Sequence, residues 1–196
     1  MKKVAIALVA ILLGLVMLPV AATPGLTAQT LHPRDLWPGS PAGIRGSTSE
    51  NWSGYAVETS LTSPEDGVIN SVAGTWTVPT VTSNGYSAVW VGIDGYSDNT
   101  VEQIGTMQYY SGRTANYYAW YEMYPSAMVQ IVEPVTPGDH MSATVSWNGS
   151  VPNSFTLTLN DTSHSWTYST TILAGSTDYQ RQSAEWIVEA PAEEIG

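Results

Sequence analysis

The chain has 196 residues, carries a formal net charge of −11 and contains no cysteine. Because nucleic-acid binding requires a basic surface, this charge argues against a nucleic-acid partner. Without cysteine the chain has no disulfide bond, thiol nucleophile or thiolate metal site. The length suits one domain behind a short leader. Short runs rich in Val, Thr, Tyr and Trp, separated by Gly, Pro, Asn and Ser, indicate an all-β domain.

Residues 1–23 have the features of a secretory signal peptide. Lys2 and Lys3 give the positive start, an apolar run extends from Val4 to Val20, and small residues that suit cleavage follow it. A membrane anchor is the alternative, because the run is close to the minimum spanning length. We expect a secreted, extracellular product that has no stable membrane association after cleavage.

Residues 24–48 are expected to form a linker or a short pro-segment. Four prolines and several glycines in this stretch leave no periodic pattern. The folded domain is then expected to occupy residues 49–196, and we expect it to be a monomer.

Strand alternation is clearest in AVWVGIDG, residues 88–95. Successive strand residues point to opposite faces. One apolar face consists of Val89, Val91 and Ile93. Trp90 and Asp94 lie on the other face, which we expect not to be a core face. A second strand begins with residues 101–105 and brings Gln103 close by. We interpret this as a binding face, and an ordinary half-exposed sheet is the alternative.

Two later segments place carboxylates on a similar face. Residues 116–125 put Glu122 among aromatic rings, and alternation within residues 184–190 groups Glu185 with Glu189. For Glu122 the alternative is a surface residue beside ordinary cross-strand aromatic partners. The other expected strands are Asn51–Val57, Gly74–Pro79, Met141–Trp147, Ser154–Leu159 and Ser165–Ile172.

Several types of catalytic site lack the residues that they need. No GxSxG motif is present, and His140 and His164 are expected in turns away from a nucleophile, which argues against a Ser–His–Asp triad. A zinc site needs clustered His or Cys residues, and the sequence has no such cluster. Asp94–Asn99 is better explained as a polar turn than as a calcium loop. We therefore expect no metal and no cofactor. Carboxylate acid–base chemistry remains, for hydrolysis of a peptide or a glycosidic bond.

Six segments resemble the glutamic peptidases, the eqolisin or G1 family, in the order of that family. They are NWSGYA, GTWTVP, AVWVGIDG, VEQIGT, AWYEMYP and AEWIVE, and they run from Asn51 to Glu189. The resemblance implies an antiparallel β-sandwich of two packed sheets, of the concanavalin or lectin-like type. It also implies a secreted acid endopeptidase that acts on protein or peptide substrates through a glutamate and a glutamine.

Residue by residue, the resemblance implies that Gln103 and Glu189 are catalytic, with Glu185 as a neighbour. The substrate-binding residues that it implies are Trp52, Trp90, Asp94 and Glu122. Met107 departs from the family, which usually has Asp at that position. The family also continues for several strands beyond the glutamate, so we expect a sandwich that lacks its last strands, truncated at the C-terminus.

The expected mechanism uses ionised Glu189 to activate a water molecule and the amide of Gln103 to stabilise the oxyanion. Two alternatives remain open at this point. Aromatic faces with carboxylates also suit a carbohydrate-active or carbohydrate-binding β-sandwich. The early end of the sequence suits an inactive secreted fragment.

Overall fold

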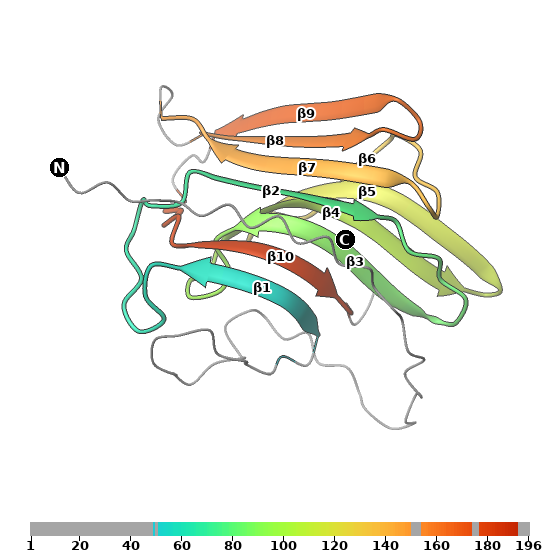
Figure 1. Ribbon diagram of the computed structural model, residues 1–196, viewed down its shortest axis with the longest axis horizontal. Helices are drawn as coiled ribbons and strands as arrows, with labels where there is room; N and C mark the ends of the chain where they lie inside the picture. The colour runs from blue at the N-terminus through green and yellow to red at the C-terminus, as the bar shows by residue number, and fades with distance from the viewer. Residues whose placement is uncertain (1–48, 50, 150–153, 174–176, 192–196) are drawn as a thin grey trace.

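The alternating segments pair into two antiparallel sheets in the computed structural model (Figure 1). The structure describes residues 49, 51–149, 154–173 and 177–191. The predicted signal peptide, residues 1–23, and the linker, residues 24–48, lie outside the described residues. Among the described residues, no helix has the length and apolar character needed to cross a membrane.

The larger sheet, sheet A, has six strands and the smaller one, sheet B, has four. Sheet A runs in the order β1 (Trp52–Glu58), β10 (Ser183–Glu189), β3 (Gly85–Ile93), β4 (Val101–Ser111), β5 (Thr114–Tyr124) and β6 (Val129–Ile131). Sheet B runs in the order β2 (Ser71–Thr77), β7 (His140–Trp147), β8 (Ser154–Asp161) and β9 (Trp166–Leu173). This arrangement confirms the predicted antiparallel β-sandwich. β6 was not predicted from the sequence, because its three residues carry too little alternation to be recognised.

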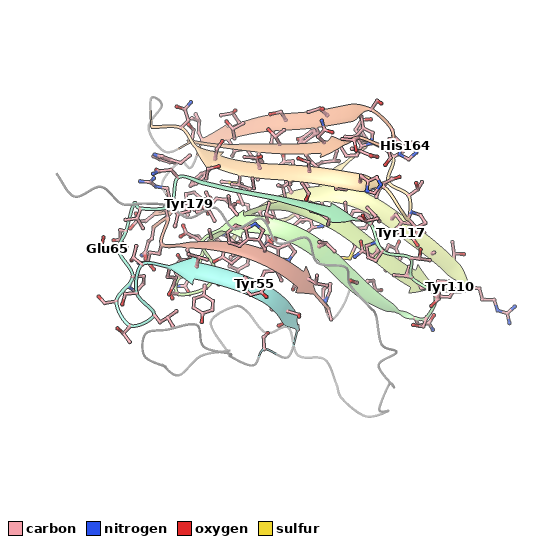
Figure 2. All side chains as sticks on the ribbon, in the orientation of Figure 1. Tyr55, Glu65, Tyr110, Tyr117, His164 and Tyr179 are labelled. Atoms are coloured by element: carbon pink, nitrogen blue, oxygen red, sulfur yellow. The ribbon has the colours of Figure 1, made fainter. Side chains whose placement is uncertain are left out.

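The main core lies between the two sheets, where the side chains shown in Figure 2 fill the space. Val91 and Ile93 of β3 point into it, as their alternation predicted, together with Ile104 of β4. Sheet B contributes alternating residues of β7 and β8, of which Phe155 and Leu157 are fully buried. Burial of these side chains supplies most of the favourable free energy of folding.

The opposite, outer face of sheet A is also largely buried, contrary to the expectation that the Trp90 face is not a core face. Trp90 and Trp120 are 1% and 0% exposed, and Met107 is fully buried beside them. The rings cover one another, since Trp52 packs edge-on against Trp90 with ring centroids 5.0 Å apart. Large rings on neighbouring strands thus form a second apolar cluster, and polar side chains on this face lie in a largely apolar environment.

The outer cluster requires a glycine at position 105. A Cβ atom there would lie 2.6 Å from the Cβ of Trp90 and would collide with the backbone oxygen of Val89. We therefore expect Gly105→Ala to lower the free energy of unfolding by about 1–3 kcal/mol, the usual cost of overpacking. Urea denaturation followed by tryptophan fluorescence measures this change.

Gly149→Ala is the matched control for this substitution, because its Cβ would meet only Trp147 Nε1 at an ordinary 3.7 Å. Equal stability of the two variants would contradict the close packing of β3 and β4 described above.

Candidate active site

Four in-register positions on the outer face of sheet A form a polar row across its central strands. Gly92 of β3 pairs with Gln103 of β4 and with Glu185 of β10, and Gln103 pairs in turn with Glu122 of β5. The glycine keeps the middle of this row open, since a Cβ there would lie 3.3 Å from the Cβ of Gln103. Antiparallel register therefore places an amide and two carboxyl groups along one line of the sheet.

Gln103 and Glu122 form the closest polar contact of this row. The Gln103 Nε2 donates a hydrogen bond to Glu122 Oε2 at 2.5 Å, and Gln103 is 8% exposed. Burial raises the pKa of Glu122 to about 7, the hydrogen bond from Gln103 opposes this rise, and the charge of Glu189 adds to it. The sequence analysis assigned these two side chains to different roles, and the structure joins them.

Glu189 lies at the end of β10, on the same face. Its Oε2 accepts a hydrogen bond from Trp90 Nε1 at 2.9 Å, and its Oε1 accepts one from Asn51 Nδ2 at 3.3 Å. Burial raises the pKa of Glu189, while hydrogen bonds from Trp90 and then Trp52 act to lower it. Its charge also raises the pKa of Glu122, so the Gln103–Glu122 pair and Glu189 share one electrostatic environment.

The indole of Trp90 links the polar row to Glu189. Glu189 pairs with Ala88, and Trp90 lies between Ala88 and Gly92 on the same face of β3. Trp90 donates to Glu189 on one side, and on the other its ring lies 3.1 Å from the position of a Cβ at Gly92. Trp90 thus lies between Glu189, which pairs with Ala88, and the row that contains Gln103, which pairs with Gly92.

Asn51 is a functional candidate that the sequence analysis did not identify. It precedes β1, and its amide holds Glu189 while its backbone oxygen accepts a hydrogen bond from the N–H of Ala190 at 2.7 Å. Ser49 Oγ in turn donates to Asn51 Oδ1 at 3.2 Å. The signal available in the sequence was an amide side chain immediately before a strand of the resembling segment NWSGYA.

Asp94 follows the end of β3 and differs from the other predicted site residues in its contacts. It has φ of 67° and is fully buried, and its carboxylate accepts hydrogen bonds from the backbone N–H groups of Arg181 and Gln182, each at 2.7 Å. Burial raises the pKa of Asp94 to about 8, and the charge of Asp98 adds to the rise. The Asp94 carboxylate therefore supports the segment that leads into β10.

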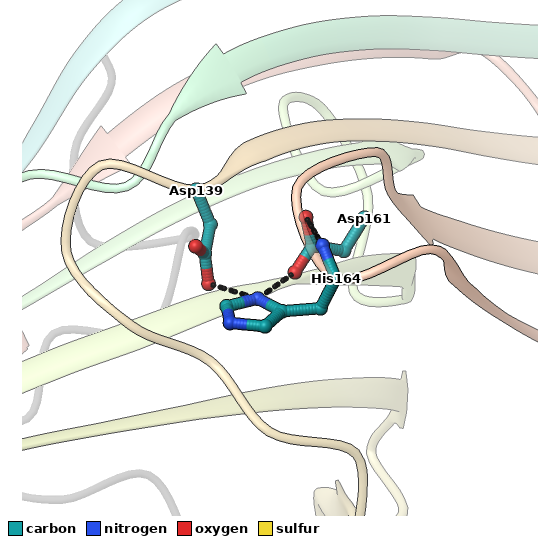
Figure 3. Close-up of side chains that lie close together, drawn as sticks. All are labelled: Asp139, Asp161 and His164. Atoms are coloured by element: carbon teal, nitrogen blue, oxygen red, sulfur yellow. Dashed lines mark hydrogen bonds and ion pairs between the residues drawn. The ribbon is translucent and has the colours of Figure 1, made fainter.

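A second group of polar side chains lies in sheet B, where the turn before β7 meets the loop between β8 and β9 (Figure 3). His164 Nδ1 is 2.9 Å from Asp161 Oδ2 and 3.3 Å from Asp139 Oδ2, and one atom of each group lies within 4.8 Å of the others. The group contains one histidine and two carboxylates, so it is not the clustered His or Cys that a zinc site was expected to need. The hydrogen bond to Asp161 raises the pKa of His164. The carboxylates also accept hydrogen bonds from Thr136 and Ser163, so the cluster holds two loops together.

The sequence of residues 50–195 matches the model of the Peptidase A4 family. The chain belongs to this family. The match confirms the resemblance to the glutamic peptidases that the ordered segments indicated. A comparison with curated protein sequences found no match.

Solved structures similar to this family member agree with its fold. Two are scytalido-glutamic peptidase with transition-state analogues, one of them peptide-based, at 26% and 27% identity and TM-scores of 0.60 and 0.59. In both cases the match covers 71% of this chain and 64% of the other. A third is SCP-B, a member of the eqolisin family in complex with the tripeptide Ala-Ile-His, at 25% identity, a TM-score of 0.57 and coverage of 71% and 63%. This chain thus spans less than two thirds of the length of these structures.

The buried contacts of Asp94 predict the effect of its removal. Asp94→Ala leaves two backbone N–H groups without their acceptor, so we expect the free energy of unfolding to fall by about 2–6 kcal/mol, at about 1–3 kcal/mol for each buried unsatisfied group. Asp94→Asn keeps one acceptor oxygen for one of these two N–H groups and loses the other, so we expect a smaller fall, of about 1–3 kcal/mol. Urea denaturation of both variants checks this expectation. A peptide KM that rises while stability is unchanged would instead favour direct substrate contact by Asp94.

Proposed function

We propose that this Peptidase A4 family member is a secreted acid endopeptidase that uses Gln103 and Glu189. The observation that carries the proposal is the placement of Gln103, Glu122 and Glu189 on one face of sheet A, where a 2.5 Å hydrogen bond joins Gln103 to Glu122. A carboxylate can act as the general base and an amide as the oxyanion donor in peptide hydrolysis, so the two kinds of group that such a mechanism needs are present on this face.

In the proposed mechanism, ionised Glu189 removes a proton from a water molecule as that water attacks the scissile carbonyl carbon. The carbonyl oxygen becomes an oxyanion, which the Gln103 amide stabilises by a hydrogen bond. The resulting neutral acid at Glu189 then gives its proton to the leaving nitrogen, and the C–N bond breaks. Each proton removed is thereby returned, and the carboxylate is regenerated.

The amide of Gln103 has enough donors for this role. A carboxamide nitrogen carries two N–H groups. One of them donates to Glu122, which fixes the orientation of the amide, and the second remains for the oxyanion. The Gln103 Oε1 has no hydrogen-bond partner among the described residues. Glu122 therefore acts as a positioning residue that orients the amide before substrate binds.

The environment of Glu122 favours work in acid. With a pKa of about 7, Glu122 is neutral over the acidic range and places no second negative charge beside Glu189. Ionisation of Glu122 at higher pH would disfavour the ionised base and the developing oxyanion alike. An acid optimum follows from this arrangement without a metal ion.

The carbohydrate alternative has less support. Sugar binding on an aromatic face needs exposed ring surfaces, whereas Trp90 and Trp120 are 1% and 0% exposed. The match to the Peptidase A4 family also favours a peptide substrate.

The roles of the two proposed catalytic residues can be separated by substitution. We expect Glu189→Gln to lose at least about 100-fold in kcat/KM, because the general base is absent. Gln103→Ala should lose about 100- to 1000-fold, mainly in kcat, because it removes an oxyanion donor. Digestion of a denatured protein substrate, at the pH where the wild-type protein is most active, measures both. The matched control is Glu133→Gln, which changes an exposed glutamate of the same charge. Activity equal to that of the control in either variant would contradict the mechanism.

The raised pKa values of Glu189 and Glu122 predict a bell-shaped dependence of kcat/KM on pH. Activity should fall as pH drops through the raised pKa of Glu189, because the base becomes protonated, and fall as pH rises through about 7, because Glu122 ionises. In Glu122→Gln the upper limit should move to higher pH. Initial rates, taken only where circular dichroism shows a folded protein, test this. An unchanged upper limit would assign it to another group.

A further inference from the structure

The most unusual feature next to the proposed catalytic residues is a group of buried and half-buried carboxyls at one end of sheet A, near the start of β10. Its members are Glu58, Asp94, Asp98, Glu102 and Glu185. We refer to them as the acid cluster. Six of their oxygens are buried without a hydrogen-bond partner among the described residues: Glu58 Oε2, Asp98 Oδ2, and both oxygens of Glu102 and of Glu185. Burial of even one ionised carboxylate without a partner is strongly unfavourable.

Glu102 and Glu185 are the two extreme members of the acid cluster, and both are fully buried. They lie on opposite faces of sheet A, since Glu102 pairs with Ile93 of the main core and Glu185 pairs with Gly92 of the outer face. Their positions along β3 are adjacent, so both carboxyls are at the same end of the sheet.

A loop and a strand end close this part of the sheet. Asp98 Oδ1 accepts hydrogen bonds from the backbone N–H groups of Gly95 and Thr100, at 3.1 and 3.0 Å, which shapes the loop between β3 and β4. Ser97 Oγ donates to a carboxyl oxygen of Glu58 at the end of β1. The loop thus connects β1 to the centre of the sheet beside Glu185.

Positive charge near the acid cluster comes from Arg181, which is mainly engaged elsewhere. Its Nη1 donates to Asn70 Oδ1 at 2.7 Å, and its guanidinium lies 4.4 Å above the ring of Trp147. No ion pair joins Arg181 to a carboxylate within the described part of the chain. One guanidinium offsets only a small part of five negative charges, so another source of neutralisation is needed.

We propose that protons hold this end of sheet A closed: Glu102 and Glu185 are packed as neutral carboxylic acids, and their ionisation as pH rises opens the sheet end that leads into β10. The groups facing Glu185 are Asp94, Asp98, Glu58 and the hydroxyl of Ser183. Those facing Glu102 are Asp94, Asp98, Glu185, Arg181 and Tyr179. Tyr179 is labelled in Figure 2 at this end of the molecule.

The direction of the effect follows from proton linkage. Burial raises the pKa of both groups well above the ordinary glutamate value, and the surrounding carboxyls add to the rise. Between the unfolded pKa, about 4.3, and the folded pKa, the native state holds more protons than the unfolded state. Stability is therefore complete at low pH and decreases as pH rises, by about tenfold in the unfolding equilibrium per pH unit for each group.

The test is urea denaturation of the full chain from about pH 4 to pH 8, compared between wild type, Glu102→Gln and Glu185→Gln. In wild type the unfolding equilibrium constant should rise with pH. In each variant this rise should be smaller by about a factor of ten per pH unit, whatever the absolute stability of the variant. Glu133→Gln, an exposed glutamate, should keep the wild-type dependence. Glu122→Gln provides a second reference, because Glu122 titrates near pH 7 outside the acid cluster.

Two measurements on wild type keep the proposal testable if a variant does not fold. Unfolding near pH 6 should release protons, which the dependence of calorimetric enthalpy on buffer ionisation enthalpy counts. Hydrogen exchange should show that backbone amides of residues 181–185 lose protection with rising pH before those of β7 and β8 do. These readouts do not depend on peptidase activity, so they stand or fall separately from the proposed function.

Three results would overturn the proposal. The first is an identical pH dependence in wild type and both variants. The second is unfolding near pH 6 without proton release. The third is a protein stabilised at pH 7 by added calcium chloride and destabilised by a chelator, because a cation would then be the neutralising group.

Discussion

The pairing of β10 between β1 and β3 is the interaction on which the rest of the structure depends. This strand is the last described one in the chain, and it joins the first strand to the centre of sheet A through residues more than 90 positions apart in sequence. The pairing places Glu189 beside Trp90 and Asn51, and it places Glu185 in register with Gln103 across Gly92. Because alternation has a period of two, a slip of one residue would turn both glutamates toward sheet B.

The outer face of sheet A combines apolar packing with polar chemistry. Trp90 fills space left by Gly92 and Gly105, and the indole N–H that its burial would otherwise leave unsatisfied donates to Glu189. In the same way, the Gln103 amide donates a hydrogen bond to one of the two carboxyl oxygens of Glu122. The low-dielectric surroundings make these contacts stronger than they would be in water, and in the proposed mechanism they orient Glu189 and Gln103 before a substrate binds. On this face, the packing of the aromatic rings and the orientation of the polar side chains thus depend on the same contacts.

Alternation in the sequence predicted the strands around Trp90, Glu122 and Glu189 and the face that each side chain occupies, because these segments are long enough to show a period of two. It did not predict that the Trp90 face is buried, since burial depends on which rings meet across strands. Nor did it predict the contact between Gln103 and Glu122, which requires the β4–β5 register. The contacts of Asp94 depend on a loop conformation with positive φ, for which no local pattern exists.

Proton occupancy connects the fold with the proposed chemistry. Glu122 in the site and Glu185 in the acid cluster lie on one face, and burial raises the pKa of each. A site built on a β-sheet can be only as precise as the strands that carry it, and β10 carries both Glu185 and Glu189. If ionisation at Glu185 loosens the start of β10, the register that presents Glu189 weakens over the same pH range in which Glu122 ionises. Acidic conditions then favour the folded strand and the catalytic protonation state together, through separate residues.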